Sequence, residues 1–200
     1  LAGKGTNDAS RNRSPNDGTN GEHGFFPFNQ TVSTVVASRY NYGFGAKLQF
    51  DFTLTSDGQV VVGKDASGKD IEVPIKFFFS GDDDVWVYID GKLVLDVGGA
   101  HGKASGLLEF GADSTVTPYV SSNKNTDTSD TMVYQTDTTK TVCFNQTPVT
   151  FTKTIGKAIQ LDKDRTTHTL TMFYMERGMW ESNMAVAFNF PDNNKLQVEK

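Results

Sequence analysis

The chain has 200 residues, among them 15 Phe, 19 Gly and a single cysteine, and its net charge is −5 at pH 7. This length and aromatic content suit one folded domain with a sizeable core and exclude a disordered chain. The negative charge argues against a nucleic-acid partner, the single cysteine excludes an intrachain disulfide, and no apolar run is long enough to predict a membrane-spanning helix.

The chain divides into three parts by composition. Residues 1–24 are polar, rich in Gly and Asn, and without apolar periodicity, which predicts a flexible N-terminal segment. An apolar run at 25–28 opens the predicted domain, which extends to residue 191. Pro and polar residues then form a stop signal, so residues 192–200 are predicted to be a linker or the first strand of a following domain.

Alternating apolar and polar residues predict antiparallel strands along the whole domain. The patterns lie at 48–54, 73–79, 85–89, 93–97, 107–110, 168–176 and 184–190. Asp90-Gly91 is the signal of a tight hairpin, and the polar stretch 121–140 predicts an exposed loop or insertion. Trp86 lies inside a strand and is predicted to belong to the core. No helical pattern of useful length occurs, so we expect an all-β, antiparallel β-sandwich with long loops.

Three consecutive carboxylates, Asp82, Asp83 and Asp84, separate two strands that are predicted to be buried. Adjacent carboxylates repel one another at neutral pH. A bound Ca²⁺ is the simplest way to offset this repulsion, because Ca²⁺ is a hard cation that prefers oxygen ligands. A solvated acidic turn without a metal is the alternative.

Several segments together carry a resemblance to a known family. The run Phe79–Val94, continued by Asp96–His101, resembles the fibro-slime subfamily of anthrax-protective-antigen-type lectin domains. Met172–Arg177 and the Ser182-Asn183-Met184 that follows are similar to the closing strands of that subfamily, and Gly43–Leu54 is similar to its opening. The resemblance implies a jelly-roll-like β-sandwich of the kind found in extracellular adhesins. The lack of a disulfide, with the resemblance of residues 194–200 described below, favours a Gram-positive surface adhesin.

The resemblance also implies a calcium site. In adhesins of this type, two successive Asp residues joined by a cis peptide bond hold Ca²⁺. This implies Asp82 and Asp83 as metal ligands, with Asp83 and Asp84 as the alternative pair. Asn183, in the loop after Arg177, is the implied side-chain ligand from the end of the domain.

The same loop and one Gly-rich segment supply the candidate ligand contacts. Trp180 is a candidate platform for a sugar, since an exposed indole offers an apolar face to a pyranose, or else a cap on the core. Met179 and Glu181 flank it and are grouped with it. His101 follows two Gly residues and is either a ligand contact or a turn residue.

Two functions follow from these expectations. The first is a calcium-dependent carbohydrate-binding adhesin module, displayed outside a bacterial cell and attaching it to glycans or glycoproteins of host or neighbouring cells. The second is a structural or protein-binding module of a surface adhesin or pilin, in which Ca²⁺ only stabilises the fold. Residues 194–200 resemble the start of a collagen-adhesin-type B module, with Lys200 as a candidate for an isopeptide bond, and further domains of the same surface protein are expected partners.

We do not expect an enzyme. His23, His101 and His168 lie far apart in the sequence, and no serine lies in a nucleophile elbow. Glu176 and Asp90 are the one pair of carboxylates considered for glycoside hydrolysis. Membrane insertion and nucleic-acid binding are not expected either.

Overall fold

The structure is a computed structural model that describes residues 43–81, 84–99, 104–121, 140–144, 147–154, 158–177 and 184–191. Within these ranges the chain consists of antiparallel strands and one 3-10 turn, Ala112–Ser114. The predicted all-β, antiparallel sandwich class is therefore confirmed. The same ranges contain no helix that is both long enough and apolar enough to cross a membrane.

Four strands form the first sheet of the sandwich. Their spatial order is β1 (Phe44–Thr53), β12 (Thr167–Glu176), β5 (Asp84–Ile89) and β6 (Lys92–Asp96). β12 lies between two neighbours, as its apolar character on both faces predicts. Its inward side chains are buried, whereas Phe173 and Met175 on the outer face are 40% and 43% exposed.

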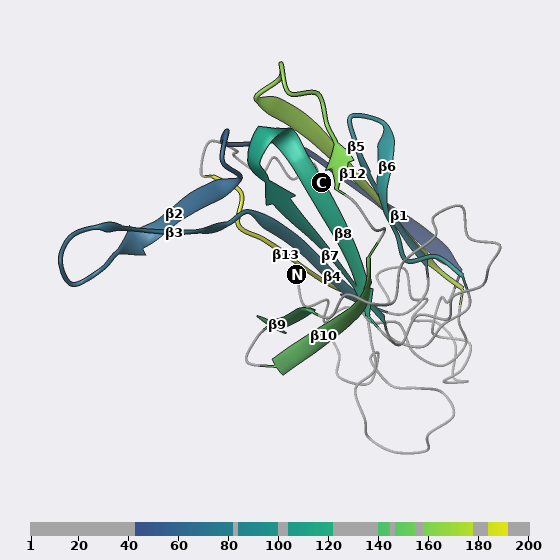
Figure 1. The fold of residues 1–200 in the computed structure, drawn as a ribbon. Coiled ribbons are helices and arrows are strands. Elements are labelled where there is room, and N and C mark those ends of the chain that lie inside the picture. Colours follow the sequence, from purple (N-terminus) through teal and green to yellow (C-terminus); the bar gives the residue numbers. More distant parts are fainter. Residues whose placement is uncertain are drawn as a thin grey trace, which may run out of the picture.

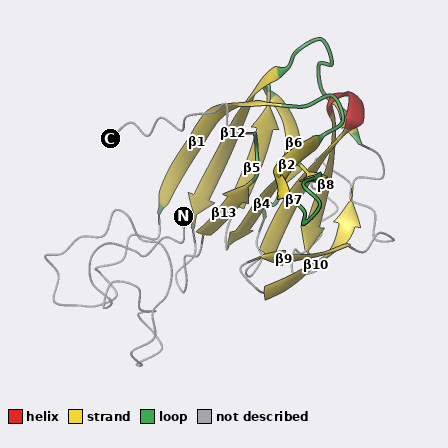
Figure 2. Ribbon diagram, turned by 90° about the vertical axis from the view of Figure 1, so that its left-hand side faces the viewer, coloured by secondary structure: helices red, strands yellow, loops and turns green. Residues whose placement is uncertain are grey.

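The second sheet is larger. Its spatial order is β13 (Met184–Phe188), β4 (Lys76–Gly81), β7 (Ala104–Gly111), β8 (Thr115–Ser121), β10 (Thr147–Thr154) and β9 (Lys140–Phe144), with β11 (Ile159–Gln160) also paired to β8. The two sheets form the layers of the sandwich (Figures 1 and 2). Residues 122–139, most of the predicted polar loop, lie outside the described residues.

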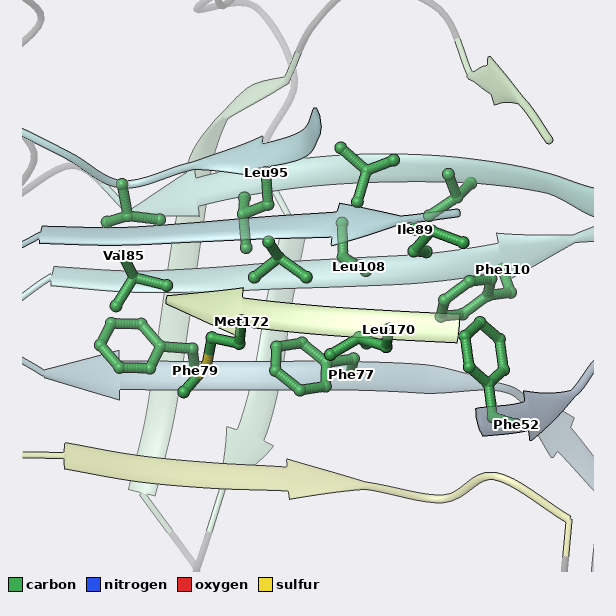
Figure 3. Packing of buried hydrophobic residues seen from close by; sticks show 14 of the residues in the cluster. Phe52, Phe77, Phe79, Val85, Ile89, Leu95, Leu108, Phe110, Leu170 and Met172 are labelled. Atoms are coloured by element: carbon green, nitrogen blue, oxygen red, sulfur yellow. The ribbon is translucent and has the colours of Figure 1, made fainter. Parts of the chain in front are cut away.

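One large apolar cluster fills the space between the sheets (Figure 3). Phe77 and Leu108 from the second sheet and Val87 and Leu170 from the first are all fully buried. Burying an aromatic or aliphatic side chain of this size stabilises the fold by about 1.5–3 kcal/mol. The apolar positions of the alternating sequence patterns are thus the side chains that point into this core.

A third, two-stranded sheet projects from the sandwich as the hairpin β2 (Gln59–Lys64) and β3 (Asp70–Pro74) (Figure 1). The single strand predicted at 73–79 is therefore wrong. The chain leaves the hairpin at Pro74, inserts the fully buried Ile75 into the core and continues as β4. The alternation of side chains continues across this junction, so the sequence pattern does not reveal that two different sheets meet there.

The prediction that Trp86 belongs to the core is also wrong. Trp86 and Tyr88 are half-buried on the outer face of the first sheet, because Val85, Val87 and Ile89 occupy the inner face of β5. The indole packs closely on Gly98, where a Cβ atom would lie 3.1 Å from the ring. A side chain at that position would therefore displace the indole.

Candidate functional site

Asp84 is the one predicted site residue that the structure describes, and it forms a joint between three segments. Asp84 is the first residue of β5, and its side chain is only 6% exposed. Arg177, which follows β12, donates from Nε to Oδ2 at 2.6 Å and from Nη2 to Oδ1 at 3.0 Å. The backbone N–H of Gly99, after β6, donates to Oδ1 at 2.6 Å.

We call these contacts the Asp84 joint. A bidentate arginine–carboxylate pair is among the stronger polar contacts in proteins, because both partners are charged and the planar groups match in shape. The joint fixes the end of β12 and the segment after β6 against the start of β5. Asp84, Gly99 and Arg177 therefore lie together at one end of the first sheet, and each of them is the first or last described residue of its segment.

The other predicted site residues lie outside the described residues. They are Asp82, Asp83, Asn183, His101, Met179, Trp180 and Glu181. The implied cis peptide bond between Asp82 and Asp83 lies there as well, so the calcium set remains a prediction. Among the described residues, His, Cys, Asp and Glu form no group of three or more placed to hold a metal.

Arg177 is the functional residue that the sequence analysis left without a role. β12 and β5 are in a register that places Met175 opposite Asp84, so Arg177 lies two residues beyond the position opposite the acid. An arginine directly after an apolar strand is a signal for a partner at the strand end. The identity of that partner depends on the register between β12 and β5, and one sequence does not supply that register.

We expect the loss of Arg177 to lower the free energy of unfolding more than the loss of the Asp84 charge. Arg177→Met leaves a buried carboxylate without its counter-charge and should lower the free energy of unfolding by about 2–3 kcal/mol. Asp84→Asn leaves a guanidinium that is half-exposed and can be solvated, so its loss should be about 1–2 kcal/mol. Urea unfolding of both variants and of the double variant measures this, and the double variant should lose less than the sum.

The exposed pair Lys64–Asp70 provides the control for this experiment. Both side chains are largely solvated, so Lys64→Met should change the free energy of unfolding by less than about 1 kcal/mol. Strictly additive losses at Asp84 and Arg177, or a loss no greater than that of the control, contradict the joint.

A second polar contact lies at the opposite end of the first sheet. His168 is fully buried, and its Nδ1 lies 2.6 Å from Oδ2 of Asp90, the residue at the β5–β6 turn. The N–H of Thr169 donates to Oδ1 of the same carboxylate at 2.9 Å. Since a carboxylate only accepts, Nδ1 carries the donated hydrogen, while Nε2 is buried without a hydrogen-bond partner. The pair fastens the hairpin turn to β12.

Glu176 and Asp90 do not form the pair of carboxylates that glycoside hydrolysis requires. Thr169 lies beside Asp90, and Glu176 follows Thr169 by seven residues on the same extended strand. At about 3.3 Å per residue this separates them by roughly 23 Å, whereas paired glycosidase carboxylates lie about 5–10 Å apart. Glu176 is itself buried and accepts a hydrogen bond from the hydroxyl of Tyr174 at 2.9 Å.

The contacts of Asp90 predict that the fold loses stability in acid. Burial opposes ionisation, but the bonds from the Thr169 N–H and the His168 ring, with the charges of His168 and Arg165, hold the pKa of Asp90 below its ordinary value. A carboxyl whose pKa is lowered by folding stabilises the protein above its unfolded pKa of about 3.9, and this contribution is lost as the pH falls through the folded pKa.

The measurement is the free energy of unfolding as a function of pH. Asp90→Asn should be less stable than the wild type by about 1–2 kcal/mol at neutral pH, and the difference should shrink below about pH 4. Asn suits the turn, where Asp90 has φ of 51°. An equal difference at every pH contradicts the assignment.

Comparisons with known proteins give short, partial matches. No family model matches the chain, and no solved structure matches it. Three of its relatives are proteins of Dictyostelium discoideum. The chain is 41% identical to protein psiO over 64 residues, 39% identical to protein psiP over 69 residues and 39% identical to protein psiB over 87 residues.

These matches cover a small share of the relatives. They span 32%, 34% and 39% of this chain, but only 6%, 7% and 13% of psiO, psiP and psiB. Each match therefore covers only a short part of a much longer protein.

The comparisons overturn the predicted identity. The relatives are eukaryotic proteins and no family model matches, so the assignment to a fibro-slime lectin domain of a Gram-positive surface adhesin is wrong. The predicted function, a calcium-dependent carbohydrate-binding adhesin module of a bacterium, is wrong with it. The described motif residues instead have local structural roles. Asp84 binds Arg177, Asp90 binds His168, and Gly98 makes room for an indole.

Proposed function

We propose that this chain is a non-catalytic binding module of a longer protein, with its binding end at the Asp84 joint. One observation carries the proposal: a buried carboxylate accepts three hydrogen bonds from two other segments and so fixes Asp84, Gly99 and Arg177 at one end of the first sheet. A rigid scaffold that positions loops at one end is a common way to present a binding surface. The short matches to much longer relatives agree with a module.

Ca²⁺ is the ion that we propose for this end. Asp84 already has three donors, so it needs no metal to satisfy its charge. Asp82 and Asp83 directly precede it in the sequence and supply further carboxylates, the ligand type that Ca²⁺ prefers. Neither a bacterial surface nor a glycan is part of this proposal.

The described acid–base residues support a non-catalytic role. His168 is fully buried and bonded to Asp90, so a substrate has no access to its ring. Glu176 is buried and accepts a hydrogen bond from the hydroxyl of Tyr174. These groups serve as internal hydrogen-bond partners that fix the ends of β12.

Thermal unfolding with Ca²⁺ and with a chelator tests the proposal. A ligand that binds only the folded state raises the melting temperature, by the equivalent of about 2.7 kcal/mol at a hundredfold excess over Kd. We expect this rise in the wild type and in Asp70→Ala, which removes an exposed acid of the hairpin, and we expect it to vanish in Asp83→Ala. No rise in the wild type, or the same rise in all three proteins, contradicts the proposal.

A further inference from the structure

A groove of about 680 Å³ lies between the β2–β3 hairpin and the end of β13. Runs of consecutive residues line it, namely 55–57, 59–62 and 189–191, together with Glu72 of β3. It lies at the end of the sandwich opposite the Asp84 joint, where β1 ends and the hairpin projects (Figure 1). Its volume falls within the range of about 300–1,000 Å³ that is typical of ligand sites.

One wall of the groove is the extended strand β2, and residues 55–57 form a turn at its foot. Side chains of an extended segment point alternately to opposite sides, so consecutive residues border one groove where the edge of the segment faces it. In the described part of the chain β2 pairs only with β3, and the N–H and C=O of its first residue, Gln59, are bonded to the side chains of Asp57 and Thr55. Beyond Gln59 the other edge of β2 offers backbone groups for pairing. The edge carries Val60, Val61 and Val62, and the last two are 51% and 56% exposed.

Both walls are fixed to the sandwich before anything binds. At the base of the hairpin, the N–H of Ile75 donates to the carbonyl of Gly58 at 2.8 Å. On the opposite wall, Asn189 donates from Nδ2 to the carbonyl of Pro74 at 3.0 Å, and its Oδ1 accepts from the N–H of Lys76 at 2.6 Å. A groove with fixed walls loses little conformational freedom when an extended segment enters it.

The charge of the groove restricts its occupant. Asp57 and Glu72 are the charged side chains among the described residues that line it, and both are acidic. Lys64, the lysine of β2, is bonded to Asp70. Between the acids, the valines and Phe190 supply an apolar lining.

We propose that this groove binds an extended peptide of a partner protein in which aliphatic side chains alternate with Lys or Arg. The peptide adds a strand to the open edge of β2, so main-chain hydrogen bonds supply affinity. Its aliphatic side chains contact the valines and Phe190, and its cations lie near Asp57 and Glu72. This site goes beyond the proposed ion-binding end and does not depend on it.

Fluorescence polarisation with labelled synthetic peptides tests the proposal. The probe is a peptide of alternating Lys and Val, compared with peptides of alternating Glu and Val and of alternating Lys and Ser. We expect the Lys–Val peptide to bind at least about tenfold more tightly than either of the others, a difference of about 1.4 kcal/mol.

Two variants with the same added charge separate the groove from the rest of the hairpin. Val62→Lys places a cation in the groove and should weaken binding of the Lys–Val peptide about tenfold or more. Ile71→Lys places the same charge on an exposed residue of β3 that does not line the groove, and it should bind like the wild type. Circular dichroism confirms that both variants are folded.

Three results overturn the proposal. The first is no binding of the Lys–Val peptide, and the second is an equal loss in Val62→Lys and Ile71→Lys. The third is a wild-type dimer in light scattering that Val62→Lys converts to a monomer, because the open edge of β2 is then covered by a second copy of the chain.

Discussion

Phe52→Ala is expected to lower the free energy of unfolding by about 3–5 kcal/mol, the largest effect of a single substitution that we predict. Phe52 lies at the end of β1 and is fully buried. Its ring centre lies 5.5 Å from that of Phe110 on the other sheet, 4.3 Å from Phe190 and 5.8 Å from His168. The truncation removes contacts between both sheets and leaves a cavity that the surrounding β-strands cannot fill by collapsing.

Phe188→Ala is the matched control. Phe188 is also an aromatic residue at a strand end and stacks on Phe50 at 5.0 Å, but it is 41% exposed. Its loss should be about 1–2 kcal/mol, because solvent replaces part of the side chain. Urea unfolding of the two variants measures the difference. Similar losses for the two would show that Phe52 does not join the sheets as described.

Gly58→Ala is expected to produce the second large loss, of about 3 kcal/mol or more. Gly58 has φ of +70°, a conformation that L side chains rarely adopt, and it lies where the hairpin leaves the sandwich. A Cβ atom here would lie 2.7 Å from the carbonyl carbon of Gly111. Backbone atoms cannot move away without disturbing β7, so strain and overlap add.

Gly68→Ala separates these two causes. Gly68 lies in the hairpin turn with φ of +85°, but no atom lies within 4 Å of the position that a Cβ would take there. Its loss should reflect strain alone, about 1–2 kcal/mol. Thermal and urea unfolding should therefore show a larger loss of free energy of unfolding in Gly58→Ala than in Gly68→Ala, and the difference is the cost of the overlap with Gly111. Equal losses would mean that the base of the hairpin is not packed on β7, and the groove along β2 would then lack a fixed wall.

The sequence pattern predicts the class of fold because burial imposes a period of two on every strand. The hairpin at Asp90-Gly91 is confirmed for the same local reason, since both residues have positive φ, of 51° and 78°. The predicted strands near 85–89 and 168–176 also match β5 and β12 closely. These features depend on neighbours in sequence, and one sequence contains that information.

Features that depend on pairing between distant strands are not predictable in this way. The split of the predicted strand at Ile75 follows from the hairpin base, where Gly58 and Ile75 are bonded. The partner of Asp84 is Arg177, which is distant in sequence and reaches the acid through the register of β12 on β5. Trp86 faces outward because its two neighbours on β5 are the ones that fit the core.

The wrong family assignment has a related physical cause. Asp-Gly after an apolar strand is also what a tight antiparallel hairpin requires, whatever the family. In this chain Asp90-Gly91 makes the turn, and Gly98 allows the indole of Trp86 to pack. A motif whose residues serve the local fold does not by itself identify a ligand or a source organism.

In the proposed binding end Asp84 is the anchor, and the carboxylates before it hold the ion. Isothermal titration with Ca²⁺ measures both roles. We expect saturable binding by the wild type, loss of binding in Asp83→Ala, and binding at least about tenfold weaker in the double variant Asp84→Asn/Arg177→Gln, because the ion pair that anchors this end is then gone. No binding by the wild type, or wild-type affinity in either variant, would contradict the proposal.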